Sequence, residues 1–301
     1  MKPWPALAPF AQTLSLPGGE LFYYDSVGGE LEKPAIVFIH GLGDEADTWR
    51  YMFPPLIKAG YRVIAPDLPV FGRSQWTGKI SIQGHCEAVM RLMAHTEAAS
   101  AQRPAVLAGN SLGTGLAEII AGKQPDLVKA LILIDGCFPM DLTMNAGFLF
   151  LALPKLGERW YRGFRSNHEA AWKSLYPYYA DLENMNSTDK DFLRERVIAR
   201  VESDNQERGY FSTLRSMIKT SALGKKASSR NMQAWPGKIA LIWGEKDRMF
   251  TPDKSALFRS LRPDAEYTVI SGAGHLPHQE KPEETLAVIE KFLQSVLKNV
   301  V

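Results

Sequence analysis

The chain has 301 residues, of which 45% are hydrophobic and 23% are charged. This composition is ordinary for a soluble globular protein, and the length is enough for one large domain or for a core domain with an insertion. Thirty-five basic and thirty-three acidic side chains give a net charge of +2 at pH 7. Such an even balance argues against nucleic acid or an anionic membrane as the main partner.

The N-terminal residues and the cysteines bear on where the protein acts. Residues 1–9 contain three prolines and no long apolar run, which is not the pattern of a secretory signal. No stretch reaches the roughly 18 apolar residues that a membrane span needs. Cys86 and Cys137 lie far apart and match no metal-ligand spacing, so we expect two reduced thiols. These features predict a cytoplasmic protein without a membrane partner.

The first part of the chain alternates between predicted strands and predicted helices. Residues 14–16 and 20–25 flank a Pro-Gly-Gly turn and predict a β-hairpin. Apolar runs typical of strands buried on both faces occur at residues 35–39, 61–65, 103–108 and 128–134. Helical patterns occur at residues 49–59, 81–100 and 116–121. Such alternation predicts a mostly parallel sheet covered by helices on both faces.

The alternation breaks between Phe138 and Met232, where several helical patterns occur and no strand pattern of comparable quality does. One helical pattern covers residues 189–203, and Thr188 and Asp191 fit a capping box at its start. Aromatic residues crowd the first half of this stretch. We expect most of them to pack against the core and a minority to line a pocket.

Strand and helix patterns alternate again after this stretch. Strands are predicted at residues 238–243 and 266–270, and the last helix at residues 282–297. We therefore expect a core domain made of residues 1–137 and 233–301. Residues 138–232 are expected to form a helical cap inserted into it.

Residues 109–113 read Gly-Asn-Ser-Leu-Gly and lie between a predicted strand and a predicted helix. A strand that turns at once into a helix strains its central residue, and flanking glycines remove the Cβ atoms that would clash. The hydroxyl of Ser111 is then held near the N–H of Leu112 and the N-terminus of the helix. This pattern predicts a nucleophile beside an oxyanion-binding site. The alternative is a glycine-rich turn that happens to contain a serine.

Three more loops follow predicted strands, and ligands of such sheets sit at the carboxyl ends of the strands. A serine needs an adjacent base, for which His275 fits, and the imidazole needs a carboxylate, for which Asp247 fits. The His-Gly-Leu-Gly run at residues 40–43 allows the N–H of Leu42 to serve as a second oxyanion donor. The order Ser, Asp, His is the one expected for a strand–turn–helix nucleophile.

Other residues near these motifs remain as alternatives or as structural residues. Asp135, at the end of the strand after the nucleophile helix, can supply the acid instead of Asp247. His278 is an alternative base, although we expect it to be structural. Thr114 is expected only to crowd the turn at Ser111.

Four further polar residues are expected to be structural. Asp67 and Arg73 are expected to form an ion pair that shapes their loop. His85 and His95, on one predicted helix, are expected to be packing or surface residues.

Taken together, these motifs resemble those of the α/β-hydrolase fold family. The resemblance rests on residues 40–43, 67–74, 109–113, 244–247 and 274–275. It implies a doubly wound, mostly parallel sheet of the eight-stranded type with an inserted helical cap. It also implies Ser111 as nucleophile, Asp247 as acid and His275 as base, with the N–H groups of Leu42 and Leu112 as oxyanion hole, and no cofactor or metal.

The residue at the nucleophile position narrows the function. Haloalkane dehalogenases and epoxide hydrolases of this family carry an aspartate there, so Ser111 argues against both. We expect a serine hydrolase that cleaves a carboxylic ester of a small-to-medium apolar or aromatic substrate. The same triad suits a hydrolase that cleaves carbon–carbon bonds of ring-fission products. Hydrolases of that kind resemble this chain in the asparagine before the serine, at position 110. A non-catalytic binder of small molecules is the third hypothesis.

Overall fold

The computed structural model describes residues 1–138 and 150–298, with residues 221–231 as backbone alone. Within these residues, nine strands form one sheet in the order β1-β2-β4-β3-β6-β7-β8-β9, with β5 paired to β2. Their bounds are β1 Ala11–Leu16, β2 Gly19–Asp25, β3 Ile36–Ile39, β4 Val63–Pro66, β5 Gln75–Trp76, β6 Ala105–Asn110, β7 Val128–Ile134, β8 Lys238–Gly244 and β9 Glu266–Ile270. From β4 to β9 every neighbouring pair is parallel, whereas β2 pairs antiparallel with β1, β4 and β5. The predicted hairpin and mostly parallel sheet are confirmed.

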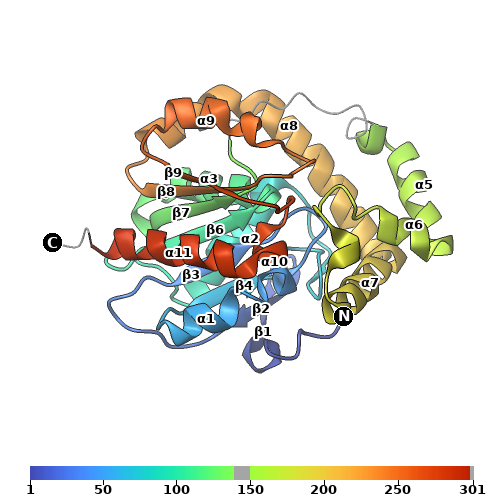
Figure 1. Ribbon diagram of the computed structural model, residues 1–301, viewed down its shortest axis with the longest axis horizontal. Coiled ribbons are helices and arrows are strands. Elements are labelled where there is room, and N and C mark those ends of the chain that lie inside the picture. Colours follow the sequence, from blue (N-terminus) through green and yellow to red (C-terminus); the bar gives the residue numbers. More distant parts are fainter. Residues whose placement is uncertain (139–149, 299–301) are drawn as a thin grey trace.

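Helices cover both faces of the sheet (Figure 1). One face carries α2 (Ile82–His95), α3 (Leu112–Lys123) and α9 (Ala256–Leu261), and the other carries α1 (Phe53–Lys58) and α11 (Pro282–Leu297). Side chains alternate along β3, so that Val37 and Ile39 pack on the first face and Ile36 and Phe38 on the second. The apolar runs of the sequence therefore supply two cores, one on each face.

Two predicted elements differ in extent from the structure. The strand expected at residues 103–108 runs to Asn110, so Ser111 follows the strand directly. The helix expected at residues 49–59 divides into a 3-10 turn, Ala46–Trp49, and the short helix α1. Two prolines stand in the first turn of α1, where they fit without breaking a hydrogen bond.

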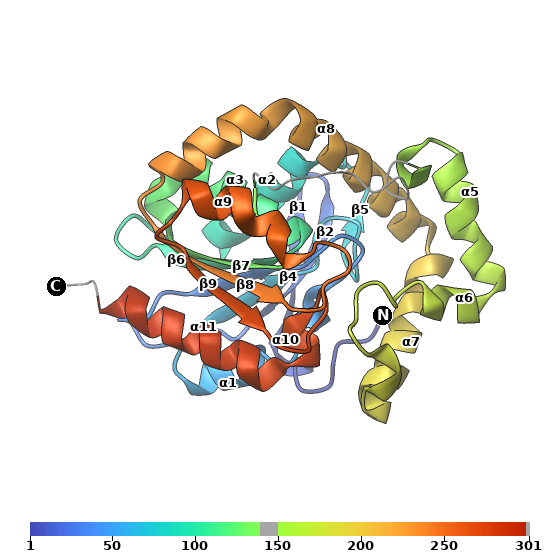
Figure 2. The ribbon, with the colours of Figure 1, turned by 45° about the horizontal axis from the view of Figure 1, so that its top comes forward.

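Between β7 and β8, the part of the chain that the structure describes is mainly helical. It contains α5 (Leu156–Arg162), α6 (His168–Lys173), α7 (Ser187–Glu202) and α8 (Asp204–Ala234). Helices α5 to α7 stand together at one end of the sheet, and α8 runs from them back along α2 and α3 (Figures 1 and 2). Helix α8 is continuous across residues 232 and 233, where the boundary between cap and core was expected.

The predicted capping box of α7 is wrong. The helix begins at Ser187, and its N-cap is Asn186, whose side chain accepts a hydrogen bond from the N–H of Asp189 at 2.9 Å. Asn186 also donates to the Asp189 carboxylate at 2.7 Å. Because Asn186 satisfies this end of the helix, Thr188 and Asp191 lie inside the first turns rather than at the cap.

Two further expectations can be compared with the structure. Cys86 and Cys137 are free and buried, as expected for reduced thiols. Within residues 1–138 and 150–298, the helices are all too short or too polar to cross a membrane.

Candidate active site

Ser111 lies between β6 and α3 in a backbone conformation that few residues adopt, with φ +51° and ψ −115°. Close approach of the chain on both sides explains the two glycines. A Cβ on Gly109 would lie 2.3 Å from the carbonyl carbon of Gly113, and a Cβ on Gly113 would lie 2.1 Å from the Ile39 oxygen. The strained turn is therefore built into the packing of β6 and α3 against β3.

The hydroxyl of Thr114 is hydrogen-bonded in this turn. Its Oγ1 donates to the carbonyl oxygen of Ser111 at 2.6 Å, and its backbone N–H donates to the same oxygen at 3.0 Å. Thr114 therefore does more than crowd the turn, because it ties the first turn of α3 to the backbone of Ser111.

His275 and Asp247 form a buried hydrogen-bonded pair. The Nδ1 atom of His275 lies 2.8 Å from Oδ2 of Asp247, and each residue is 2% exposed. The other oxygen of Asp247 accepts the N–H groups of Met249 at 2.7 Å and Phe250 at 3.0 Å. The carboxylate thus fixes the imidazole with its proton on Nδ1, which leaves Nε2 as the acceptor.

Ser111 and His275 line the same cavity, which has a volume of about 360 Å³. Asn110 ties the two loops together, because its side-chain amide donates to the backbone oxygens of His275 and Ile134, both at 3.2 Å. The structure therefore brings the predicted serine and histidine to one cavity and places Asp247 against the histidine ring.

The predicted oxyanion donors lie at the same place. Leu42 lines the cavity, and a Cβ on its neighbour Gly41 would lie 3.4 Å from the Cβ of Ser111. Leu112 is the first residue of α3. Neither the N–H of Leu42 nor that of Leu112 has a protein acceptor among the described residues. Two unpaired N–H groups next to a serine are what an oxyanion site requires.

Hydrogen bonds hold the loop that carries Leu42. His40 is buried and, as a neutral ring, bonds to the Gly41 oxygen at 2.7 Å through Nδ1 and accepts the N–H of Leu68 at 2.9 Å through Nε2. Burial lowers the pKa of His40. The expected ion pair of Asp67 and Arg73 is present at 2.7 Å, and Arg73 together with hydrogen bonds holds the pKa of Asp67 below its usual range despite burial.

Neither of the alternative residues, Asp135 and His278, lines the cavity that Ser111 and His275 share. His278 stacks on Trp49 with ring centres 4.4 Å apart and lies 2.9 Å from the Thr48 hydroxyl. Burial lowers the pKa of His278 to about 3. Asp135 is buried beside Asp247, and its Oδ1 accepts the N–H of Gly244 at 2.8 Å.

The two histidines of α2 differ in their environment. His85 is buried and lies 2.9 Å from the Thr213 hydroxyl, and burial lowers its pKa to about 3. His95 is exposed.

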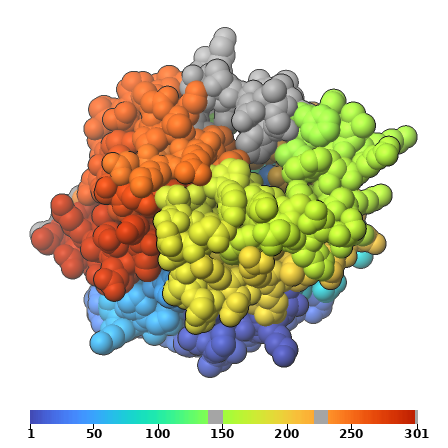
Figure 3. All heavy atoms as spheres, turned by 45° about the vertical axis from the view of Figure 1, so that its right-hand side comes forward, coloured from blue at the N-terminus to red at the C-terminus, as the bar shows by residue number. Residues whose placement is uncertain are grey.

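Aromatic and aliphatic side chains from the helices between β7 and β8, and from the turns that connect them, line most of the cavity. The aromatic lining residues are Trp160, Tyr161, Phe164, Tyr178, Tyr179 and Tyr210. In Figure 3 the helices α5 to α7 spread over this end of the molecule, and the surface is hollowed beside the light green α5 segment. Trp172 packs elsewhere, in a small cluster with Leu182 and Leu193. More than half of the described aromatic residues in the first half of residues 138–232 line the cavity, so the expectation that only a minority would do so is wrong.

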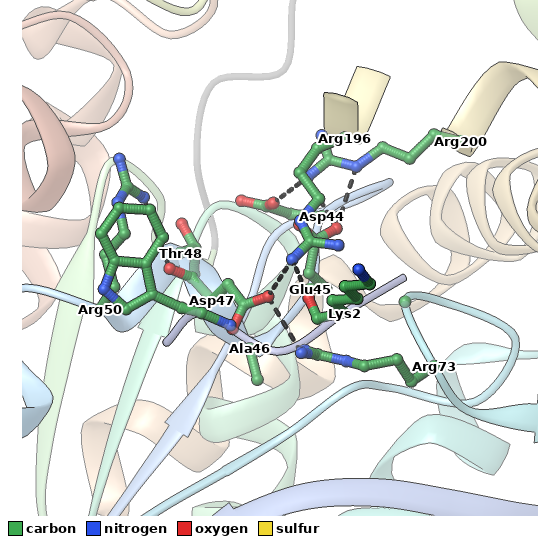
Figure 4. A network of polar contacts seen from close by, with 12 residues as sticks. Lys2, Asp44, Glu45, Ala46, Asp47, Thr48, Arg50, Arg73, Arg196 and Arg200 are labelled. Atoms are coloured by element: carbon green, nitrogen blue, oxygen red, sulfur yellow. Dashed lines mark hydrogen bonds and ion pairs between the residues drawn. The ribbon is translucent and has the colours of Figure 1, made fainter. Parts of the chain in front are cut away.

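A network of acids and arginines beside the cavity was not predicted (Figure 4). Arg200 of α7 contacts Asp44 at 2.6 Å and Glu45 at 2.7 Å, and Arg196, one turn earlier, contacts Asp47 at 3.0 Å. Both Asp44 and Arg200 line the cavity. The available signals were the acids at positions 44, 45 and 47, directly after the His-Gly-Leu-Gly run, and two arginines four residues apart on a helix.

Among the described residues, three side chains have donor atoms close enough together for a metal ion. Oxygen atoms of Asp135 and Asp247 and a ring nitrogen of His275 lie within 4.8 Å of one another. Asp247 and His275, however, are already hydrogen-bonded to each other through Oδ2 and Nδ1 at 2.8 Å. The donor set therefore fits a hydrogen-bonded acid–base pair better than a cation site.

Comparisons with known proteins agree with this architecture. The family model described as alpha/beta hydrolase fold matches residues 34–282. The chain is 25% identical over 295 residues to Lipase 1 of Psychrobacter immobilis, covering 95% of this chain and 84% of that protein. It is 23% identical over 274 residues to an sn-1-specific diacylglycerol lipase of Mus musculus, covering 90% and 84%.

Solved structures with the same fold span several chemistries. A thermophilic esterase from Thermogutta terrifontis has a TM-score of 0.73 at 22% identity, covering 95% of this chain and 98% of that one. A haloalkane dehalogenase from Bradyrhizobium elkanii has a TM-score of 0.75 at 18% identity, covering 95% and 97%. These likenesses show the fold alone, and the chemistry depends on the residues of the site.

Proposed function

This chain belongs to the α/β-hydrolase fold family and is a hydrolase, and from that premise we propose that it cleaves carboxylic esters through an acyl-enzyme on Ser111. The observation that carries the proposal is the 2.8 Å contact between His275 and Asp247 at a cavity that Ser111 also lines. The lipases among its relatives support an ester as the bond that is cleaved.

In the first half of the proposed reaction, Oγ of Ser111 attacks the acyl carbon. Its proton passes to Nε2 of His275, and the Asp247 carboxylate on Nδ1 stabilises the imidazolium that forms. The N–H groups of Leu42 and Leu112 receive the oxyanion of the tetrahedral intermediate. His275 then gives the proton to the departing alcohol, which leaves the acyl group on Ser111.

In the second half, water takes the place of the alcohol. His275 removes a proton from the water, whose oxygen attacks the acyl carbon, and the oxyanion again faces Leu42 and Leu112. Collapse of the second intermediate returns the proton to Ser111 and releases the acid. The reaction draws on side chains and backbone groups alone and calls for no cofactor.

The lining of the cavity supports a small-to-medium apolar or aromatic substrate. Its volume of about 360 Å³ is at the small end of ligand pockets. Among its charged residues, Arg200 is neutralised by Asp44 and Glu45. We propose that residues 138–232 act as a cap whose aromatic residues select the substrate.

No observation favours the carbon–carbon bond hydrolase over the esterase. The feature that suggested the carbon–carbon bond hydrolase was the asparagine at position 110. The side-chain amide of Asn110 donates hydrogen bonds to the backbone oxygens of His275 and Ile134. A structural role therefore accounts for that residue.

The test is an ester panel, including p-nitrophenyl acetate and butyrate, given to the wild type and to Ser111→Ala. We expect the substitution to lower kcat by at least about 10⁴-fold and to abolish labelling by a fluorophosphonate, because no other group replaces the nucleophile. Ser174→Ala is the matched control. It also lines the cavity, but its hydroxyl donates to the Ala171 oxygen at 2.6 Å, so it should keep both activity and labelling.

Two results contradict the proposal. Ester turnover that survives in a folded Ser111→Ala protein removes Ser111 as nucleophile. A wild type that turns over no ester but bleaches a coloured dienoate replaces the esterase with the carbon–carbon bond hydrolase.

A further inference from the structure

Two buried carboxyl groups lie side by side behind the ring of His275. Asp135 follows β7 and Asp247 follows β8, and these strands are parallel neighbours. The N–H of Asp135 donates to the Ile242 oxygen at 2.9 Å, and the N–H of Gly244 donates back to Oδ1 of Asp135 at 2.8 Å. Sheet topology thus brings both acids to one place, where their oxygens lie within 4.8 Å.

The two carboxyl groups differ in the donors that surround them. Asp247 accepts three hydrogen bonds, from two backbone N–H groups and the His275 ring. Asp135 accepts one, and its Oδ2 is buried and meets no donor among the residues that the structure describes. Donors stabilise the ionised form of a carboxyl group, so the negative charge belongs on Asp247.

Two buried carboxyl groups this close are unstable when both are ionised, and a shared site of this kind holds one proton. That proton belongs on the oxygen without a donor, which is Oδ2 of Asp135. An oxygen that looks unsatisfied as an acceptor then becomes a donor facing the Asp247 carboxylate.

We propose that Asp135 is a positioning residue, which stays protonated and donates a hydrogen bond from Oδ2 to the Asp247 carboxylate, holding it against His275. This proposal rests on the proposed function for its kinetic meaning. Asp135 does not line the cavity, so it acts through Asp247 alone.

The electrostatic surroundings of Asp135 agree with this assignment. Burial and the charge of Asp247 raise the pKa of Asp135 well above its usual range, and the charge of Glu280 adds to the effect. The backbone of Asp135 has a φ of +49°, a strained value for a residue with a side chain. The hydrogen bonds with Ile242 and Gly244 hold the carboxyl group in this position despite the strain.

Asparagine and leucine at position 135 test the proposal. Asp135→Asn keeps an acceptor for the N–H of Gly244 and replaces the O–H donor with an amide N–H, so we expect kcat to stay within about threefold of the wild type. Asp135→Leu fills similar space without a donor, and we expect kcat to fall about 10- to 100-fold with an unchanged KM, as for a lost hydrogen bond to a charged group. Asp247→Asn is expected to lower kcat by about 10⁴-fold.

The protonation state is measured separately from activity. An infrared difference spectrum at neutral pH between the wild type and Asp135→Asn should contain the carbonyl stretch of an un-ionised carboxylic acid. Glu118→Gln is the matched control. Like Asp135, Glu118 is a buried carboxyl group that accepts one backbone N–H, that of Phe138 at 2.8 Å, but it is not hydrogen-bonded to Asp247 or His275 among the described residues. It should remove a similar band without changing kcat.

Three outcomes overturn the proposal. They are a loss in Asp135→Asn as large as in Asp247→Asn, full activity in a folded Asp135→Leu, or a difference spectrum that shows an ionised carboxylate at position 135. If Asp135→Leu does not fold, the asparagine variant and the spectrum decide. A wild type without ester hydrolysis contradicts the proposed function instead, and the spectrum still reports on Asp135.

Discussion

Gly113 shows how one residue can be fixed by the backbone around it. A Cβ added there would lie 2.1 Å from the oxygen of Ile39 and 3.0 Å from that of His40, and neither backbone atom can move without shifting β3. Gly115, two residues later in α3, is different, because an added Cβ would meet no described atom within 4 Å.

Alanine at the two positions should therefore have opposite effects. We expect Gly113→Ala to lower the free energy of unfolding by about 2 kcal/mol or more, as for overpacking in a core. Gly115→Ala should raise it by about 0.5–1 kcal/mol, because glycine weakens a helix interior. Urea unfolding measures both values. Equal effects in the two variants would show that the close approach to β3 is not a constraint.

The residues around Ser111 could be predicted because their signals are local in the sequence. A strand, a glycine on each side of a serine and a helix occur within a few positions, and the structure has that turn. The partner of Asp135 could not be predicted in this way. Its position depends on the pairing of β7 with β8, which are separated by the helices of the inserted segment.

Helix α7 is fastened to the loop after β3 by charges that are almost fully buried. The side chains of Arg196 and Asp47 are 2% and 0% exposed, and they contact each other at 3.0 Å. Arg196 also lies 3.5 Å from Glu45. At the other end of α7, Arg50 contacts Asp189 at 2.7 Å. This loop continues from Leu42, so α7 supports the side of the cavity that carries the proposed oxyanion donor.

We expect Arg196→Ala to lower the free energy of unfolding by about 3 kcal/mol, because it leaves buried acids with fewer partners. Arg194→Ala is the matched control on the same helix. Its side chain is 46% exposed and lies 3.5 Å from Glu169, so its loss should change stability by less than about 0.5 kcal/mol. Guanidinium unfolding of both variants makes the comparison, and a small effect at both positions would mean that the network does not stabilise the fold.

The sequence could predict that residues 189–203 are helical but not where this helix docks. Glu45 and Arg200 are separated by 155 positions, and neither motif nor period links residues at that distance. The start of the helix was wrong for a simpler reason. Asn186 is as good a cap as a threonine, and the pattern did not decide between neighbouring candidates.

At the scale of the whole molecule, alternating strands and helices predicted a parallel sheet, and the sheet is parallel from β4 to β9. The order of the strands along the sheet was not predicted, because each buried apolar strand can pair with any other. The sheet separates two cores, and each contains buried groups that titrate. His85 packs against Phe71 on the α2 face, and His278 packs against Trp49 on the α1 face.

Buried histidines and buried acids give the stability opposite dependences on pH. The pKa of His85 is lowered to about 3 by burial, so the folded protein binds fewer protons there than the unfolded chain between pH 6.5 and 3. The stability from this group is complete above pH 6.5 and is lost as the pH falls. Burial raises the pKa of Glu118, so that carboxyl group favours the folded state as the pH falls, and the two effects partly cancel in the wild type.

A single substitution separates the two effects. His85→Gln keeps a group that can bond to Thr213 but cannot become protonated. When the pH is lowered from 7 to 5, the wild type loses the contribution of a buried neutral histidine, whereas His85→Gln does not. The free energy of unfolding of His85→Gln should therefore rise by roughly 2 kcal/mol relative to that of the wild type. Urea unfolding at both pH values measures this difference. The matched control is His95→Gln, because His95 is exposed on the same helix and its substitution should leave the behaviour of the wild type unchanged. If His85→Gln and the wild type change equally between pH 7 and 5, then His85 is protonated in the folded protein and burial does not hold it neutral.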